Sequence, residues 1–304
     1  MSAADITRLN RDFGIPPGQL VFVDGPSGPQ VHVNNQHATA TIALQGAHVM
    51  MYQPHNQQPL LWLSAHGKFA PGKSIRGGVP ICWPWFGPHA SAAAYPGHGF
   101  ARTVMWEVTA VDASNDAATR LELHLPAASK NIQQWPHLSE VALHVSVGER
   151  LELALITRNT GDQSFVLGDA LHTYFQVSDI RRIAIQGLEG CPYIDKVDDS
   201  KRKTQIGGVT IAAETDRIYL DSTKDCVIDD PGYGRRIRIA KRNSRSTIVW
   251  NPWMEKAEKM GDLGPDGYLH MVCVESANAD ADVVTLAPGK EHQLQVAYSV
   301  EAIV

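Results

Sequence analysis

The 304-residue sequence contains no apolar run that approaches the roughly 20 residues of a membrane-spanning helix. Its first residues, MSAADITRLNRDF, lack the apolar segment of a secretory signal. The four cysteines form no C-x-x-C pair, and their scatter is typical of reduced, mostly buried thiols. Together these absences predict a cytoplasmic protein that does not bind membranes.

Net positive charge is missing as well. A formal net charge of −5 and a pI near 6.2 argue against a nucleic-acid-binding protein. Residues 235–245 do hold six basic residues. Arg236 and Arg238 alternate with isoleucines there, which indicates a strand with a solvated basic face. The sequence also lacks an H-E-x-x-H motif and any close Cys/His cluster, so we expect no metal and no other cofactor.

Helical patterns are scarce. The apolar spacing in Ile6–Phe13 predicts one helix, and Trp253–Met260 followed by Gly261 predicts another. Short strand patterns are frequent. Leucines alternate with polar residues in Arg120–Leu125, as in a strand with one buried face. Further strands are expected at Thr39–Leu44, Trp106–Val111, Glu140–Val147, Arg150–Arg158, Leu171–Val177, Arg181–Gln186, Ile206–Ala212, Arg217–Leu220, Cys226–Ile228, Arg236–Ala240, Ser246–Trp250, Tyr268–Glu275 and His292–Glu301.

Numerous short strands with few helices predict an all-β fold, an antiparallel sandwich or barrel. Gly148-Glu149 between two strand patterns predicts a two-residue type II′ hairpin turn. No linker-like change in composition divides the chain. We therefore expect one domain over residues 1–304, with residues 1–20 as an N-terminal extension, and a monomer.

The segment Lys73–Arg102 is irregular and rich in proline, glycine and aromatic residues. Proline and glycine exclude a regular helix, and the aromatic content argues against disorder. Long ordered loops of this kind are often functional, so we interpret this one as the wall of a small-molecule pocket. A packed structural loop with two surface arginines is the alternative. The candidate residues are Arg76 and Arg102 for binding an anion, Trp83 and Trp85 for stacking, and His98 for proton transfer.

Three other positions could carry chemistry. His172 and Tyr174 share a face if their segment is a strand, which suits a proton donor beside a ring-shaped substrate or, alternatively, a hydrogen-bonded core histidine. Glu275 ends an almost purely apolar strand, where burial would raise its pKa and make it a better base. Asp216 could bind substrate hydroxyls or pair with Arg217.

Several of these segments also occur together in a known order. They are Arg76-Gly77-Gly78-Val79-Pro80, Cys82-Trp83-Pro84, Phe86-Gly87, His98-Gly99-Phe100-Ala101-Arg102, His172-Thr173-Tyr174-Phe175, Asp216-Arg217-Ile218-Tyr219, Trp250-Asn251-Pro252 and Glu275. Because these segments occur together in this order, the sequence resembles the hexose-6-phosphate mutarotases (glucose-6-phosphate 1-epimerases) of the aldose 1-epimerase superfamily. The resemblance extends from about Gly46 to Tyr298.

The resemblance implies a galactose-mutarotase-like β-supersandwich. It also implies an isomerase without a cofactor that interconverts the α and β anomers of a hexose 6-phosphate, with glucose 6-phosphate as the substrate expected first. Two alternatives stay open: a mutarotase of unphosphorylated hexoses, and a carbohydrate-binding sandwich without catalysis.

Residue roles follow from the same resemblance. It implies that His172 is the general acid and Glu275 the general base. The substrate-binding positions that it implies are Arg76, Arg102, Asp216 and His98. The chain departs from the family at Gly97, where glutamine is common.

Overall fold

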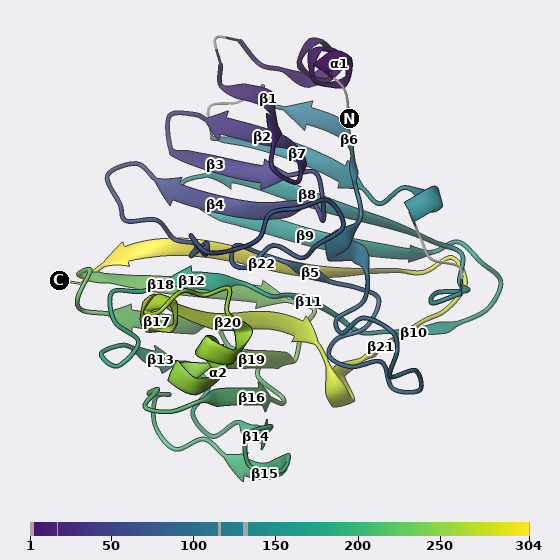
Figure 1. Ribbon diagram of the computed structural model, residues 1–304. Helices are drawn as coiled ribbons and strands as arrows, with labels where there is room; N and C mark the ends of the chain where they lie inside the picture. The colour runs from purple at the N-terminus through teal and green to yellow at the C-terminus, as the bar shows by residue number, and fades with distance from the viewer. Residues whose placement is uncertain (1–2, 17, 115–116, 130–132, 304) are drawn as a thin grey trace.

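The computed structural model describes residues 3–16, 18–114, 117–129 and 133–303. At the top of Figure 1, helix α1 (Ala3–Phe13) lies against a four-stranded sheet, the N-terminal sheet. Asn10 of α1 joins them, because its side-chain amide donates to the Phe22 carbonyl at 2.7 Å and accepts the Phe22 N–H at 2.8 Å. The strands of this sheet, in order, are β1 (Leu20–Gly25), β2 (Gly28–Asn34), β3 (Ala38–Ala43) and β4 (His48–Pro54).

An eight-stranded sheet, here called the β20 sheet, forms the lower part of the view in Figure 1. Its spatial order is β15-β14-β16-β19-β20-β11-β5, and β12 also pairs with β20. Helix α2 (Trp253–Met260) directly follows β19. The strands are β5 (Ile81–Cys82), β11 (Asp169–Leu171), β12 (Tyr174–Gln176), β14 (Pro192–Asp195), β15 (Lys201–Thr204), β16 (Thr215–Tyr219), β19 (Ser246–Asn251) and β20 (Met271–Asn278).

A second eight-stranded sheet, the β22 sheet, has the order β13-β17-β18-β22-β9-β8-β7-β6. A small separate ribbon pairs β10 (Phe165–Leu167) with β21 (Val284–Leu286). The strands of the β22 sheet are β6 (Glu107–Asp112), β7 (Ala118–His124), β8 (Ser139–Gly148), β9 (Leu151–Asn159), β13 (Ala184–Gln186), β17 (Cys226–Asp230), β18 (Arg235–Arg242) and β22 (Glu291–Ala302).

The β22 sheet packs against the other two sheets and encloses the main core with them. Leu121 and Leu123 of β7 are fully buried, as their alternation with polar residues predicts. Two hydroxyl groups link the layers. Thr173 Oγ1 lies 2.6 Å from the hydroxyl of Tyr298 on β22, and the hydroxyl of Tyr52 on β4 donates to the Gly148 carbonyl at 2.8 Å.

The predicted all-β architecture is confirmed, and so are both helices. Gly261 ends α2 with φ of 70° and donates its N–H to the Ala257 carbonyl at 3.1 Å. Other details were wrong. Val147 pairs with Leu151, so three residues connect that hairpin, and Gly148 does not have the positive φ of a type II′ turn. The expected strand at Ile206–Ala212 is irregular except for one isolated bridge.

The predicted basic strand face is real but does not include Arg235. Arg236 and Arg238 point outward and pair with Asp229 and Glu301. Arg235 lies on the opposite face of β18 and is 2% exposed. Its guanidinium group donates to the backbone carbonyls of residues 58, 59 and 176 at 2.8, 3.0 and 2.7 Å. It therefore links one end of β18 to the loop after β4 and to the end of β12.

No helix in the described part of the chain is long and apolar enough to cross a membrane.

Replacing Arg235 should lower the stability of the fold. Arg235→Met would remove three hydrogen bonds from a buried guanidinium group to backbone carbonyls, and we expect the free energy of unfolding to fall by about 2–4 kcal/mol. Arg236→Met on the solvent face should cost less than about 1 kcal/mol. Urea denaturation of both variants measures the difference, and equal losses would show that the carbonyl contacts of Arg235 contribute little.

Candidate active site

His172 and Glu275 face each other across two neighbouring strands. Leu171 pairs with Ser276 and Tyr174 pairs with Cys273, so the unchanged register sets position 172 opposite position 275. His172 Nδ1 lies 3.4 Å from Glu275 Oε1. The two side chains are 11% and 1% exposed. The pairing of β20 with β11 and β12 thus joins two residues that are 103 positions apart in the sequence.

Burial controls the charge of this pair. It raises the pKa of Glu275 well above its usual range, and the nearby Asp216 raises it further. Burial also lowers the pKa of His172 well below its usual range, and His98, Arg102 and Arg76 lower it further. Both shifts favour an uncharged carboxyl beside an uncharged imidazole. His172 Nδ1 and Glu275 Oε2 have no hydrogen-bond partner among the described residues. The pair can therefore accept new hydrogen bonds from a bound molecule.

Aromatic rings surround the imidazole. The His172 ring stacks on Tyr174, with centroids 5.0 Å apart and planes 11° apart, and Tyr174 stacks in turn on Trp62. Trp250 on β19 meets the His172 ring edge-on at 6.1 Å and is partly exposed. The face of the β20 sheet that carries Glu275 is therefore bordered by flat apolar surfaces.

Arg76 reaches the same face from the long loop. Its Nε donates to Asp262 Oδ2 at 3.0 Å, and its Nη1 donates to the Tyr174 hydroxyl at 2.9 Å. These two contacts fix the plane of the guanidinium group. Its remaining nitrogen, Nη2, has no hydrogen-bond partner in the described part of the chain, so it is free to bind an anion.

Arg102 lies in a 3-10 turn, η1 (Ala101–Thr103), at the end of the loop. Its Nη2 donates to the Gly97 carbonyl at 2.9 Å, while its buried Nε has no partner within the residues described. Beside the larger effect of burial, the charge of Arg102 lowers the pKa of His98 and of His172. Arg76 and Arg102 thus each keep a free donor.

His98 lies between these groups in a single tautomer. Its Nδ1 accepts the Gly87 N–H at 3.3 Å and lies 3.4 Å from Cys82 Sγ. Burial lowers the pKa of His98 to about 3, so the ring is neutral and its proton is on Nε2. His98 has φ of 64°, and the next residue must be glycine, because a Cβ on Gly99 would overlap the Trp83 carbonyl oxygen.

Asp216 belongs to the same face of the sheet. It pairs with Trp250, which pairs with Cys273, so Asp216 lies two strands from β20. Burial raises the pKa of Asp216, although Lys256 and Lys196 act in the opposite direction. The structure thus brings His172, Glu275, Arg76, Arg102, His98 and Asp216 toward one face.

Trp83 is a correction to the sequence analysis. Its neighbour Cys82 lies on the face of the site, and alternation along the chain turns the indole to the other face. Trp83 is fully buried in the main core, and its Nε1 donates to Thr157 Oγ1 at 3.1 Å. It cannot wall a pocket on the Glu275 side. Trp250 is the aromatic residue in that place, beside Tyr174, and Asp262 joins the site through its contact with Arg76. The sequence analysis gave no site role to Trp250 or Asp262.

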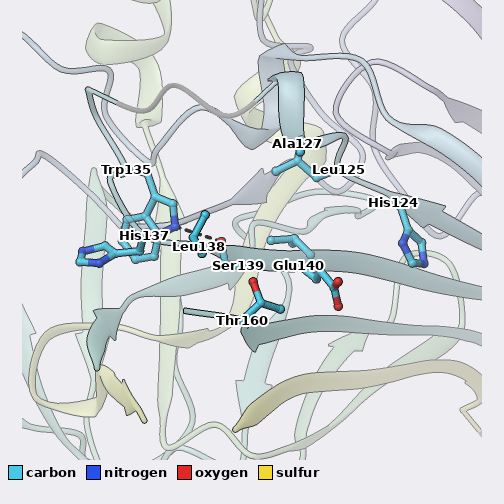
Figure 2. Close-up of a pocket in the computed structure, with 10 residues that line it drawn as sticks. His124, Leu125, Ala127, Trp135, His137, Leu138, Ser139, Glu140 and Thr160 are labelled. Carbon is cyan, nitrogen blue, oxygen red and sulfur yellow. Dashed lines mark hydrogen bonds between the residues drawn. The ribbon is translucent and has the colours of Figure 1, made fainter. Parts of the chain in front are cut away.

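A separate hollow of about 350 Å³ lies near the ends of β7 and β8. Figure 2 shows Trp135 on one side of it, with its Nε1 donating to Ser139 Oγ at 3.1 Å, and Glu140 close by. None of the six residues gathered above lines this hollow. It is therefore distinct from the candidate site.

Comparison with known proteins identifies relatives over most of the chain. Residues 29–299 match the family model described as aldose 1-epimerase. A protein of Escherichia coli (strain K12) named "putative glucose-6-phosphate 1-epimerase" is 38% identical over 248 residues, which are 81% of this chain and 82% of that protein. A protein of Cenchrus ciliaris with the same name is 34% identical over 296 residues, 94% and 89% of the two chains.

A crystal structure from Salmonella typhimurium, described as a "putative mutarotase", has a similar fold. Its TM-score is 0.87 at 32% identity, and the match covers 97% of this chain and 99% of the other. This likeness confirms the expected mutarotase-like β-sandwich.

The charge of the His172–Glu275 pair can be measured directly. We expect His172 to be an uncharged imidazole at pH 6.5, where an ordinary histidine is half protonated, because its pKa is lowered. Side-chain ¹⁵N chemical shifts report this state. The Glu275→Gln variant should give the same result, since an amide replaces a carboxyl that is already uncharged. A ring that is charged in the parent and neutral in the variant would show an ion pair instead.

Proposed function

The chain belongs to the aldose 1-epimerase family, and from that premise we propose that it interconverts the α and β anomers of a hexose 6-phosphate, glucose 6-phosphate in the first place. The observation that carries this proposal is the contact of His172 with Glu275 at 3.4 Å, on a face that also receives two arginines. The names of the relatives support the same substrate.

Anomer interconversion opens the sugar at the C1–O5 bond and closes it on the other face of C1. Opening removes a proton from the C1 hydroxyl and delivers one to O5. In our proposal Glu275 takes the first proton and His172 gives the second, and closure reverses both roles. Before opening, one proton passes from the carboxyl of Glu275 to His172, which lies 3.4 Å away, so that Glu275 can accept a proton and His172 can donate one while the total proton count of the pair stays the same. Opening leaves Glu275 protonated and His172 neutral, which is the state that burial favours.

The arginines supply preference for a phosphate ester. Guanidinium groups form charge-assisted hydrogen bonds with phosphate oxygens, and these are among the stronger ones in proteins. Nη2 of Arg76 and Nε of Arg102 are the available donors. Asp262 and Tyr174 would keep Arg76 in place while it binds.

The remaining groups would hold the sugar ring. The Nε2–H of His98 can donate to a hydroxyl, and the carboxyl of Asp216 can accept from another. Trp250 offers a flat surface to the apolar side of the ring. No step of this chemistry calls for a metal or a redox cofactor.

Catalysis is tested with freshly dissolved α-glucose 6-phosphate and an excess of a dehydrogenase that accepts only the β anomer. The protein should speed up the appearance of product, and Glu275→Gln should reduce that turnover by about 10²–10⁴-fold, because the amide cannot take a proton. Binding of the sugar phosphate, measured by calorimetry, should persist. Glu152→Gln on the β22 sheet, whose carboxylate pairs with Arg150, serves as the matched control. Near-normal turnover in Glu275→Gln would refute the base assignment.

The phosphate role of the arginines is tested by comparing two substrates. Arg102→Ala or Arg76→Ala should raise KM for glucose 6-phosphate by roughly 10–100-fold, the loss of one charge-assisted bond, and should raise KM for glucose far less. Arg120→Ala, whose side chain is 47% exposed on β7, is the control. Equal effects on both sugars would remove the phosphate assignment while leaving the epimerase proposal intact.

A further inference from the structure

A thiol lies beside the two residues assigned to proton transfer. Cys273 and Glu275 are two positions apart on β20, so their side chains project from the same face. Cys273 is fully buried and is a free thiol. Among the described residues, one donor atom each of His172, Cys273 and Glu275 lies within 4.8 Å of the others. The reaction proposed above makes no use of this thiol.

The three donor atoms form a known type of set. One imidazole nitrogen, one sulfur and one carboxylate oxygen are ligands that Zn²⁺ accepts, and three protein ligands with one open position are typical of accessible zinc sites. Bonds of about 2.0–2.3 Å in a tetrahedron separate neighbouring ligand atoms by about 3.5 Å. His172 Nδ1 and Glu275 Oε1 are already 3.4 Å apart. All three ligand atoms lie within 4.8 Å of one another, so the sulfur would have to approach the other two atoms by at most about 1.3 Å, the difference between 4.8 and about 3.5 Å.

A second observation points to a ligand at this place. Glu275 is 1% exposed, and its Oε2 has no hydrogen-bond partner in the described ranges; the same is true of His172 Nδ1. Unpaired buried polar atoms are costly. Coordination would satisfy His172 Nδ1, and it would satisfy Glu275 Oε2 as well if the carboxylate binds the ion through both oxygens. Hard ions such as Mg²⁺ require several oxygen ligands, which this set lacks.

The positive charges of Arg76 and Arg102 must be weighed against the binding of a metal cation. Arg76 and Arg102 repel a free cation. On binding, however, Cys273 would coordinate as a thiolate and Glu275 as a carboxylate, with their protons released to solvent, while His172 stays neutral. Two negative ligands cancel the charge of the ion, so the arginines then face a neutral group.

We propose that His172, Cys273 and Glu275 bind a thiophilic divalent metal ion such as Zn²⁺, and that the ion excludes the sugar phosphate from the site. The proposal that the metal binds depends only on the positions of the three ligand residues. Its inhibitory effect rests on the proposed function, because the metal occupies the atoms that would move protons. The metal is thus an inhibitor here and takes no part in the epimerase reaction.

The binding test uses the full-length protein, freed of metal by chelator, and needs no activity. Calorimetry with Zn²⁺ should show one site per chain, and Mg²⁺ should show none. Co²⁺ in place of zinc should give a near-ultraviolet band from sulfur-to-cobalt charge transfer. A cobalt spectrum without that band, or the absence of zinc binding at micromolar concentrations, would overturn the proposal.

Variants locate the site. Cys273→Ser should weaken zinc binding at least about tenfold, since even changes outside the ligand shell cost roughly 10–100-fold. Cys191→Ser, which removes a partly exposed thiol elsewhere, should not change it. Circular dichroism checks folding, and Cys273→Ala replaces the serine variant if that one fails to fold. Loss of binding in Cys191→Ser and its retention in the Cys273 variant would show an adventitious surface site and refute ours.

The inhibition test is separate. Zinc should slow the coupled assay competitively with glucose 6-phosphate, provided that the coupling enzyme alone is unaffected. Zinc binding without any measurable epimerase activity would contradict the proposed function and leave the metal site standing. Epimerase activity without zinc binding would contradict the metal site and leave the proposed function standing.

Discussion

The contact between a buried carboxyl and a buried imidazole is the constraint to which the rest of the site responds. An ionised carboxylate inside a sheet is expensive, and each unpaired polar atom there costs about 1–3 kcal/mol. Other contacts of β20 offset this free energy, because the strand is buried along its whole length and pairs with its neighbours on both sides. The strand register then leaves His172 no position except opposite Glu275.

The charged groups near this contact are held by other contacts. Arg76 depends on Asp262 and Tyr174, and Arg102 depends on a backbone carbonyl of its own loop. Their positive charges lower the pKa of His172, so the loop influences proton affinity in the sheet. The irregular loop and the regular sheet therefore act as one electrostatic unit.

Local patterns revealed most of the fold and part of the site. The alternating leucines and the Gly261 cap are signals that lie within a few residues of each other in the sequence, so α2, β7 and the sandwich class could be predicted. Local patterns named His172 and Glu275 as candidates, and the family resemblance gave them roles, but only the register shows that they meet. Trp83 was misplaced because nothing in its loop tells which face a side chain takes after Cys82. The contact of Arg76 with Asp262 joins positions 186 apart, and no local signal marks it.

The hydroxyl contact between Thr173 and Tyr298 links the residue next to His172 to β22. That strand lies between β18 and β9 in its sheet and is the last strand in the chain order. Without Tyr298, the Thr173 hydroxyl would lose this contact with the other layer. A substitution that shifts β22 would therefore disturb the strand segment that carries His172, although the two lie in different sheets.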